Sequence, residues 1–427
     1  MVKTSDELNN IAKNIFPGAN NGNPTSDLIM SKAVGSKIWD VNGRQYIDYL
    51  LGSGPMVIGH SHPKVVEAVQ NQLGSGSTFF TLNELSIELG QEIIDAVPCA
   101  EQIRYVTSGT EATLYAMRAV RTYSGKEKIL KFEGGYHGMN DYSLMSVMPK
   151  VEVDYPFPSM DSSGIPSSIK NEVLVAPFND FDTTKNIIEQ YREEIAGVVI
   201  EPFQRVIKPK PGFLKAIREI THNYNIPLIF DEIVTGFRFA YGGAQQYYDV
   251  TPDLCTLGKI VAGGFPMAAI VGKRYLMEVF NQKLKSTVPP LVQIGTLSGN
   301  PIACAAGLAT LNVLKTEDPY ENLFKTGYYL QDSLKELFNK NEIPAQVIGE
   351  GPVFDVYFCS NEISNYRDTM KADKSILNSF NSNLITLGIF KGDTKYYVST
   401  AHDAEDVDKT VSAFEIAVSK LKKQHDL

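Results

Sequence analysis

The chain has few cysteines and no long apolar run. Its 427 residues include four cysteines, at positions 99, 255, 304 and 359, and no two of them form a CxxC pair. This spacing argues against a disulfide framework and against a cysteine-rich zinc site. We therefore expect free thiols, no bound metal and a reducing, cytoplasmic environment. Because no stretch of about 18 apolar residues occurs and the N-terminus shows no signal-peptide core, we expect no membrane association.

Basic residues are also in deficit. There are 40 Lys and Arg against 49 Asp and Glu, which gives a formal net charge of −9. A chain this acidic is a poor binder of nucleic acids and of anionic membranes. The composition, 43% hydrophobic and 21% charged, is that of an ordinary globular protein with ample material for a core. The length allows two or three domains.

Short apolar runs alternate with helical stretches between about residues 100 and 275. Near-continuous β-branched runs separated by helices are typical of a mostly parallel sheet covered on both faces. We therefore predict an α/β fold whose large domain carries such a sheet. The runs are IRYVT at 103–107, KILKF at 128–132, EVLVA at 172–176, GVVIE at 197–201, PLIFD at 227–231 and AAIVG at 268–272.

The two ends of the chain predict a second, smaller α/β domain. A hairpin is expected over 36–50, where Asn42-Gly43 supplies the turn. Amphipathic patterns predict helices over 320–340 and 403–422. The predicted parts are an N-terminal segment, 1–65, that packs with the small domain, a large domain over 66–310, and a C-terminal small domain over 311–427.

Residues 151–170 interrupt the α/β pattern. The segment VEVDYPFPSMDSSGIPSSIK is rich in Pro and Ser and has no helical or strand periodicity. It is predicted to be a long surface loop, and such loops are often lids or binding loops. A simple variable insertion is the alternative.

A glycine-containing turn opens a helix in YVTSGTEATLYAMRAV, residues 105–120. Ser108 and Glu111 fit a capping box. Free N–H groups and hydroxyls at the positive end of a helix suit a phosphate. Ser108, Gly109 and Thr110 are therefore candidates for phosphate binding, with a plain helix cap as the alternative.

Two further glycine turns are candidate ligand-binding segments. FEGGYHG, residues 132–138, lets the backbone approach a ligand closely and presents Tyr136 and His137. An aromatic side chain there can stack on a planar ring, although the motif taken alone favours the alternative of a packed tyrosine in a simple glycine turn. IGTLSGNP places Gly295 and Thr296 in a second turn of the phosphate-binding type.

Three charged residues lie at or just beyond the ends of apolar runs. Asp231 ends PLIFD and Glu201 ends GVVIE, and ligands gather at the carboxyl ends of parallel strands. Lys259 lies between an apolar run and Gly263-Gly264. A lysine in a confined site can lose its proton and form an imine. For the Asp231 motif, a simple salt bridge between Glu232 and Arg238 nearby is the structural alternative.

Singly these signals are modest, but their order along one α/β domain is that of a pyridoxal phosphate (PLP) site. Such a site needs an anion-binding turn, an aromatic platform, a carboxylate for the ring nitrogen and a lysine. On these motifs the chain resembles the class III (subgroup II) PLP-dependent aminotransferases of fold type I, in the glutamate-1-semialdehyde 2,1-aminomutase-like branch. The resemblance is strongest in IGHSHPKVVEAV, SGTEATLYAMRAVR, FEGGYHG, PLIFDEIVTGFR, TPDLCTLGKIVAGGFPMAAIVG and GTLSGNP.

The resemblance implies a large domain with a mostly parallel seven-stranded sheet and a smaller α/β domain built from both termini. It also implies a homodimer with shared active sites. For the PLP phosphate, the resemblance implies Ser108, Gly109 and Thr110 of the same subunit, and Gly295 and Thr296 of the neighbouring one. For the ring, it implies Tyr136 and Ile233 against the two faces, Asp231 at the ring nitrogen and His137 among the cofactor-binding residues. Lys259 would be the imine-forming lysine, and Glu201 would lie near the cofactor hydroxyl and the reacting amine.

The chain departs from the aminomutase pattern at the expected carboxylate anchor. That family carries an arginine shortly after an N-terminal PGG-type turn, whereas PGANNGNPTSDLIM, residues 17–30, contains none. Arg205 follows the strand-end Glu201 by four residues and is a substitute anchor, because Arg binds carboxylates bidentately. Arg238 is the second choice. A surface position is the alternative for Arg205.

The sequence therefore favours an aminotransferase that moves an amino group between a small amino acid or amino ketone and a keto acid acceptor. Lys259, Asp231 and Glu201 are the predicted catalytic residues. The alternatives are the aminomutase, which transfers the amino group within one molecule, and an amino-acid racemase on the same scaffold. A catalytically silent PLP-fold protein is a further alternative, against which the intact Lys259 and Asp231 argue.

Overall fold

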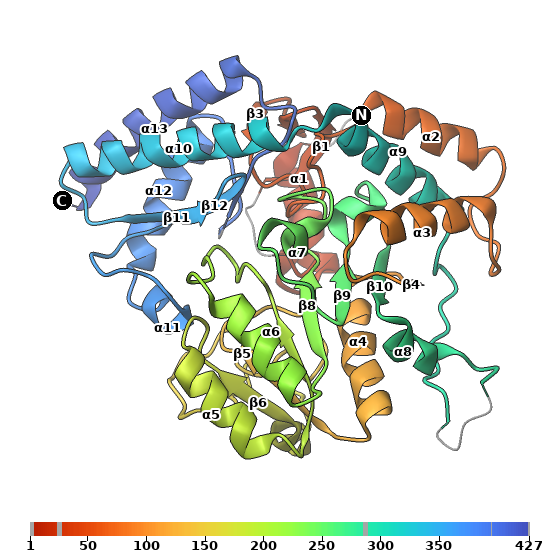
Figure 1. The fold of residues 1–427 in the computed structure, drawn as a ribbon. Coiled ribbons are helices and arrows are strands. Elements are labelled where there is room, and N and C mark those ends of the chain that lie inside the picture. Colours follow the sequence, from red (N-terminus) through yellow and green to blue (C-terminus); the bar gives the residue numbers. More distant parts are fainter. Residues whose placement is uncertain (1–3, 24–27, 285–288, 394, 426–427) are drawn as a thin grey trace. The chain divides into compact units, whose positions relative to one another are not determined.

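The computed structural model describes residues 4–23, 28–284, 289–393 and 395–425, and the chain forms two compact units (Figure 1). The segment Asn361–Lys371, which the sequence places in the C-terminal small domain, belongs instead to the larger unit. Unit 1 comprises Met1–Pro63, Glu321–Ser360 and Ala372–Leu427, and unit 2 comprises Lys64–Tyr320 and Asn361–Lys371.

Unit 2 is built on a seven-stranded sheet of order β4-β10-β9-β8-β7-β5-β6. Only β10 runs antiparallel to its neighbours, so the predicted mostly parallel sheet is confirmed. The strands are β4 (Gln102–Val106), β5 (Lys128–Phe132), β6 (Val173–Ala176), β7 (Ile195–Ile200), β8 (Leu228–Glu232), β9 (Leu254–Leu257) and β10 (Ala268–Gly272). The apolar runs predicted all of these except β9, whose sequence LCTL is interrupted by the polar Thr256.

Helices of unit 2 cover this sheet, and α4 packs against β7, β9 and β10. Small residues on its buried face, Ala112, Ala116 and Ala119, allow the helix to approach the strands closely. The region 151–170 is irregular, as predicted, until the short helix η2 (Ser167–Glu172) begins. The α-helices are α2 (Pro63–Leu73), α3 (Glu84–Ala96), α4 (Gly109–Ser124), α5 (Phe181–Tyr191), α6 (Phe213–Asn223), α7 (Gly243–Tyr247), α8 (Arg274–Met277), α9 (Pro301–Glu317) and α11 (Tyr366–Thr369).

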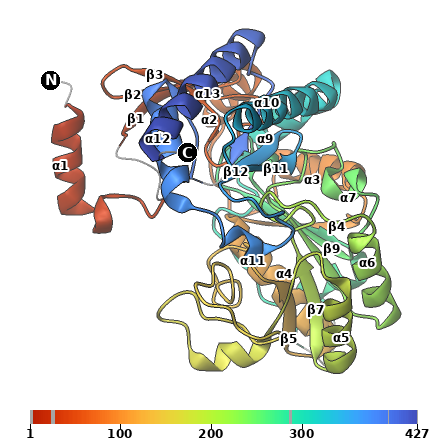
Figure 2. The ribbon, with the colours of Figure 1, turned by 90° about the vertical axis from the view of Figure 1, so that its left-hand side faces the viewer.

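Unit 1 brings the two ends of the chain into one sheet (Figure 2). The predicted hairpin is formed by β2 and β3, and Ile47 of β3 pairs in parallel with Ile389 of β13. The first sheet has the order β1 (Met30–Val34), β2 (Lys37–Asp40), β3 (Gln45–Asp48) and β13 (Ile389–Phe390), and the second has β11 (Gln346–Glu350), β12 (Val353–Tyr357) and β14 (Tyr396–Tyr397). The helices are α1 (Ser5–Ile15), α10 (Tyr320–Lys340), α12 (Lys374–Thr386) and α13 (Ala404–His425).

No helix in the described part of the chain is both long enough and apolar enough to cross a bilayer.

Candidate active site

The candidate residues gather at the carboxyl edge of the seven-stranded sheet. Asp231 is the penultimate residue of β8, Glu201 directly follows β7, and Lys259 comes two residues after β9. Because β4 and β9 are both antiparallel to β10, β4 ends at the same edge, and Ser108 follows it. Tyr136 lies in the turn after β5, which also ends there. This is the edge at which α/β sheets bind ligands.

The Asp231 carboxylate is buried and held from three directions. Its Oδ2 lies 2.7 Å from His137 Nδ1, and its Oδ1 accepts hydrogen bonds from Thr256 Oγ1 at 3.0 Å and from the Ile233 N–H at 3.2 Å. Thr256 is the residue of β9 that pairs with Asp231 of β8. The sequence analysis missed Thr256, because only strand pairing reveals it. These contacts fix the direction in which the carboxylate can act.

His137 is itself completely buried. Its backbone carbonyl accepts hydrogen bonds from Thr113 Oγ1 at 2.5 Å and from Ser143 Oγ at 2.8 Å. Its Nε2 has no hydrogen-bond partner among the described residues. The ring is thus held on one side by Asp231 and keeps one nitrogen available.

The turn before α4 has the predicted capping box. Ser108 Oγ accepts from the Glu111 N–H at 3.2 Å, and the Glu111 carboxylate accepts from the Ser108 N–H at 3.2 Å. Within the described chain, the N–H groups of Gly109 and Thr110 donate no hydrogen bond. Two donors at the positive end of a long helix therefore remain for an anion.

Ile233 joins three parts of the site. A Cβ atom at Gly109 would lie 3.2 Å from Ile233 Cδ1, and one at Gly258 would lie 2.9 Å from the same atom. The phosphate-type turn and the residue before Lys259 therefore both pack directly on Ile233. Lys259 has φ = 50° and begins the short helix η3 (Lys259–Ala262). A left-handed lysine costs roughly 1–2 kcal/mol, a cost that proteins accept mainly at functional sites.

Arg205 lies against Tyr136. Its guanidinium carbon is 4.9 Å from the centre of the Tyr136 ring, and its Nε donates to the Gly134 carbonyl at 3.0 Å. The Arg205 N–H donates to Glu201 Oε2 at 3.1 Å. Burial raises the pKa of the Tyr136 hydroxyl, Arg205 opposes that shift, and Asp231 and Glu201 add to it. Arg205 is therefore partly buried and held by contacts with Tyr136, Gly134 and Glu201.

Three predicted residues do not join this cluster. Arg238 is completely buried, and its Nε donates to the Val234 carbonyl at 2.8 Å. The Gly295 carbonyl accepts from the Ser298 N–H at 3.2 Å, while Thr296 is exposed and contacts none of the other candidates within the described chain. Within a single chain this turn therefore lies outside the cluster.

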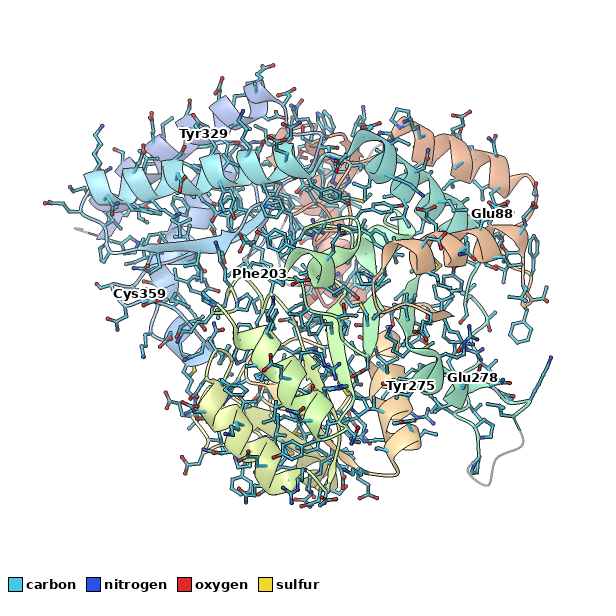
Figure 3. The ribbon with its side chains drawn as sticks, viewed as in Figure 1. Glu88, Phe203, Tyr275, Glu278, Tyr329 and Cys359 are labelled. Atoms are coloured by element: carbon cyan, nitrogen blue, oxygen red, sulfur yellow. The ribbon has the colours of Figure 1, made fainter. Side chains whose placement is uncertain are left out.

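Aromatic packing supports the loop that carries Arg205. Phe203, labelled in Figure 3, is buried and meets Phe239 edge-on at 5.1 Å between ring centroids.

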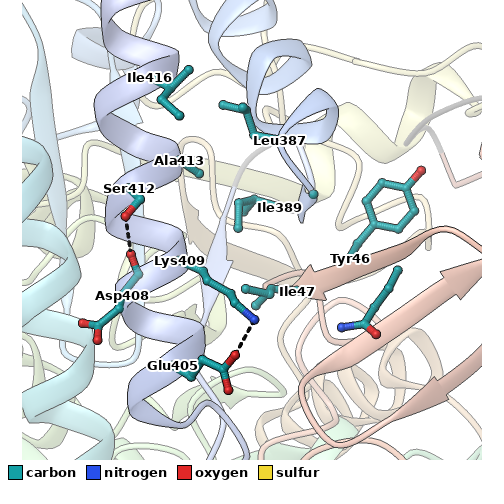
Figure 4. A pocket seen from close by; sticks show the side chains of 12 residues that line it. Tyr46, Ile47, Leu387, Ile389, Glu405, Asp408, Lys409, Ser412, Ala413 and Ile416 are labelled. Carbon is teal, nitrogen blue, oxygen red and sulfur yellow. Dashed lines mark hydrogen bonds and ion pairs between the residues drawn. The ribbon is translucent and has the colours of Figure 1, made fainter.

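A surface pocket is found elsewhere, in unit 1 between β3, β13 and α13 (Figure 4). None of the candidate residues lines it, and the Glu405–Lys409 ion pair lies at its edge. The candidate site is therefore defined by its side chains, and this pocket is separate from it.

Comparison with known proteins agrees with this geometry. The model of the family "Aminotransferase class-III" matches residues 18–388. The chain belongs to the class III aminotransferases. It is 42% identical over 395 residues to a glutamate-1-semialdehyde 2,1-aminomutase of Methanocaldococcus jannaschii. The aligned residues cover 91% of this chain and 90% of that relative. Among solved structures it is similar to an omega-transaminase from Sphaerobacter thermophilus, with a TM-score of 0.92, 32% identity and 98% of both chains covered.

Class III membership makes this chain a PLP-dependent enzyme of fold type I. A transaminase with PLP bound matches it with a TM-score of 0.91 and 25% identity over the whole of both chains. The residues at the carboxyl edge fit the cofactor. The turn at Gly109 and Thr110 suits its phosphate, the oriented Asp231 carboxylate suits its ring nitrogen, and Tyr136 offers an aromatic face.

Proposed function

We propose that the chain catalyses PLP-dependent amino transfer on a small, carboxylate-bearing substrate, with the amino group moved to the neighbouring carbon of the same molecule. One observation carries the proposal of catalysis: the Asp231 carboxylate is buried, is held by three hydrogen-bond contacts and lies at the same sheet edge as Lys259. The name of the Methanocaldococcus relative supports the aminomutase reaction, which the sequence analysis kept as its alternative.

Each residue has a defined task in this proposal. PLP, when bound, supplies an electron-withdrawing ring that stabilises negative charge on the reacting carbon. Asp231 would hold a proton at the ring nitrogen, and His137 and Thr256 keep its oxygens in place. Lys259 would carry the cofactor at rest and, once displaced, move a proton between carbon atoms through its Nζ. Glu201 would face the reacting amine from the end of β7.

The phosphate and the ring need separate holders. The N–H groups of Gly109 and Thr110, with the hydroxyls of Ser108 and Thr110, would bind the phosphate. Tyr136 would cover one face of the ring, and we assign the opposite face to Ile233. We further propose a homodimer, in which Gly295 and Thr296 would reach the phosphate of the neighbouring subunit.

Arg205 would bind the substrate carboxylate. Its Nε is taken by the Gly134 carbonyl, whereas its two terminal nitrogens have no hydrogen-bond partner among the described residues. A guanidinium with both terminal groups open can form a bidentate pair with a carboxylate. Arg205 is a better anchor than Arg238, because the Arg238 side chain is completely buried and its Nε is bonded to a backbone carbonyl.

Amino transfer between two molecules is the second candidate. It is favoured by the absence of arginine from residues 17–30 and by the similarity to the Sphaerobacter omega-transaminase. A single experiment separates the two. The purified holoenzyme is given glutamate-1-semialdehyde alone, and nuclear magnetic resonance follows whether nitrogen moves from C2 to C1. Turnover without an acceptor supports the aminomutase; turnover that requires pyruvate or 2-oxoglutarate and an amino donor supports the aminotransferase.

A further inference from the structure

A buried carboxylate that the reaction does not use lies at the end of β5. Glu133 directly follows the strand, and its side chain is only 4% exposed. Arg367 donates to both of its oxygens, from Nε at 2.8 Å and from Nη2 at 3.2 Å. Tyr155 Oη donates to the same carboxylate at 2.6 Å, and the Tyr155 ring lies 4.2 Å from the Arg367 guanidinium carbon.

This cluster ties a distant segment to the turn after β5. Arg367 lies in α11, 234 residues from Glu133 along the chain, within the segment Asn361–Lys371 that belongs to unit 2. Its Nη2 also donates to the Val153 carbonyl at 2.6 Å, and its Nη1 lies 3.3 Å from Glu152 Oε2. A bidentate pair with a buried carboxylate is far more constraining than a surface ion pair.

The next residue shows how closely the segment approaches. Gly134 has φ = 80°, and a Cβ atom there would lie 2.4–2.6 Å from the Cβ, Cγ and Cδ2 atoms of Tyr366. Tyr366 therefore packs directly on the Gly134 backbone. Only glycine satisfies both the backbone conformation and this contact. Arg367 thus holds the turn by binding the Glu133 side chain, and Tyr366 holds it by packing on the Gly134 backbone.

The side chains of two consecutive residues, Gln204 and Arg205, donate hydrogen bonds to the backbone of that turn. Gln204 Nε2 donates to the Glu133 carbonyl at 2.8 Å, and Arg205 Nε donates to the Gly134 carbonyl at 3.0 Å. Gln204 is buried, so its bond cannot be replaced easily by solvent. A shift of Glu133 would therefore move the groups that orient Arg205.

We propose that the Glu133–Arg367 pair is a positioning device for Arg205, which sets the direction of its open guanidinium groups and hence the affinity for a substrate carboxylate. This inference rests on the proposed role of Arg205. Arg367 and Glu133 are positioning residues and touch no substrate. Misplacing an anchor by a fraction of an ångström weakens a bidentate contact without removing it.

The test measures binding of propionate, an unreactive carboxylate, to the holoenzyme by calorimetry. Arg205→Ala is expected to weaken binding roughly ten- to a hundred-fold. Arg367→Met is expected to weaken it about three- to tenfold, because the anchor remains but is misaligned. Arg192→Met, which removes an arginine from an exposed ion pair with Glu193, is the matched control and should leave the dissociation constant unchanged.

The double variant Arg205→Ala/Arg367→Met decides whether Arg367 acts through Arg205. If it does, adding Arg367→Met to Arg205→Ala causes no further loss, and KM rather than kcat changes in the single variant. An equal loss in both backgrounds, or wild-type propionate affinity in folded Arg367→Met, overturns the inference. Should Arg367→Met fail to fold, Glu133→Gln and Tyr155→Phe perturb the same carboxylate more gently and are judged by the same criteria. Unchanged affinity in Arg205→Ala overturns the anchor itself.

Discussion

His137 Nδ1 lies 2.7 Å from Asp231 Oδ2, in the interior of unit 2 at the carboxyl edge of the sheet. The two residues are 94 positions apart: His137 follows β5, and Asp231 lies within β8. A buried carboxylate is costly unless its oxygens are satisfied, and here His137, Thr256 and a backbone N–H satisfy them. The contact therefore stabilises the fold and fixes the carboxylate that the proposed chemistry requires.

Asp231→Asn is expected to lower turnover by about a hundredfold or more while PLP stays bound. Asparagine has nearly the same shape but no charge, so a proton at the ring nitrogen would lose its partner. Steady-state rates and the bound cofactor, measured by absorbance, test this. Asp249→Asn alters an exposed aspartate paired with Lys215 and is the control. Near-normal turnover in Asp231→Asn would show that this carboxylate is not the partner of the ring.

Lys259→Ala is expected to abolish turnover without unfolding the chain, since Lys259 is the proposed attachment point and proton carrier. Borohydride reduction of the wild type should fix the cofactor on the peptide that contains Lys259, as peptide mass spectrometry would show. Lys273→Ala, at a partly exposed lysine paired with Glu101, should retain activity. A cofactor label on any other lysine contradicts the assignment.

Arg205→Ala is expected to raise KM for carboxylate-bearing substrates roughly ten- to a hundred-fold, which corresponds to the loss of a charge-assisted bond of about 1.5–3 kcal/mol. Simple amines should be affected little. Initial rates with matched donors that differ only in the carboxylate provide the measurement. An equal effect on charged and uncharged donors would mean that Arg205 has a structural role.

Thr296→Ala, or removal of PLP, is expected to weaken the dimer or the affinity for the cofactor. The reason is that a ligand bound between two subunits links cofactor binding to assembly. Sedimentation velocity with and without PLP measures the effect, and Thr316→Ala on the exposed face of α9 is the control. A monomer that keeps PLP and full activity would refute the shared site.

His402 predicts a loss of stability at acidic pH. Burial lowers the pKa of its ring from 6.5 to about 4, and its Nδ1 accepts from the Ser399 N–H at 3.0 Å. Between pH 6.5 and pH 4 the unfolded chain binds a proton that the folded chain does not, so stability falls as the pH falls through this range. The loss is on the order of 3 kcal/mol.

The measurement is the free energy of unfolding in urea at several pH values, for the wild type and for His402→Gln. The variant should show a shallower decline below pH 6.5, whereas His222→Gln, at an exposed histidine of α6, should follow the wild type. Parallel curves for the wild type and His402→Gln would show that His402 does not titrate in this way.

Local sequence was enough to predict several structural elements around the candidate site. The capping box of Ser108 and Glu111 depends on residues three positions apart, and the strands before Glu201 and Asp231 show as apolar runs because both of their faces are buried. The order of turn, aromatic, carboxylate and lysine then indicated PLP. These features need only short-range geometry and the rule that parallel strands end at one edge.

Tertiary structure alone decided the rest. Thr256 reaches Asp231 through strand register, and Arg367 reaches Glu133 across 234 residues. Arg238, the second choice from the sequence, is buried and bonded to a carbonyl, whereas Arg205 keeps two open groups. No periodicity or propensity encodes such pairings, because they depend on where the packed elements bring distant side chains together. Composition and local pattern therefore predicted the fold class and the cofactor, and long-range packing determined which charged groups are oriented, buried or available.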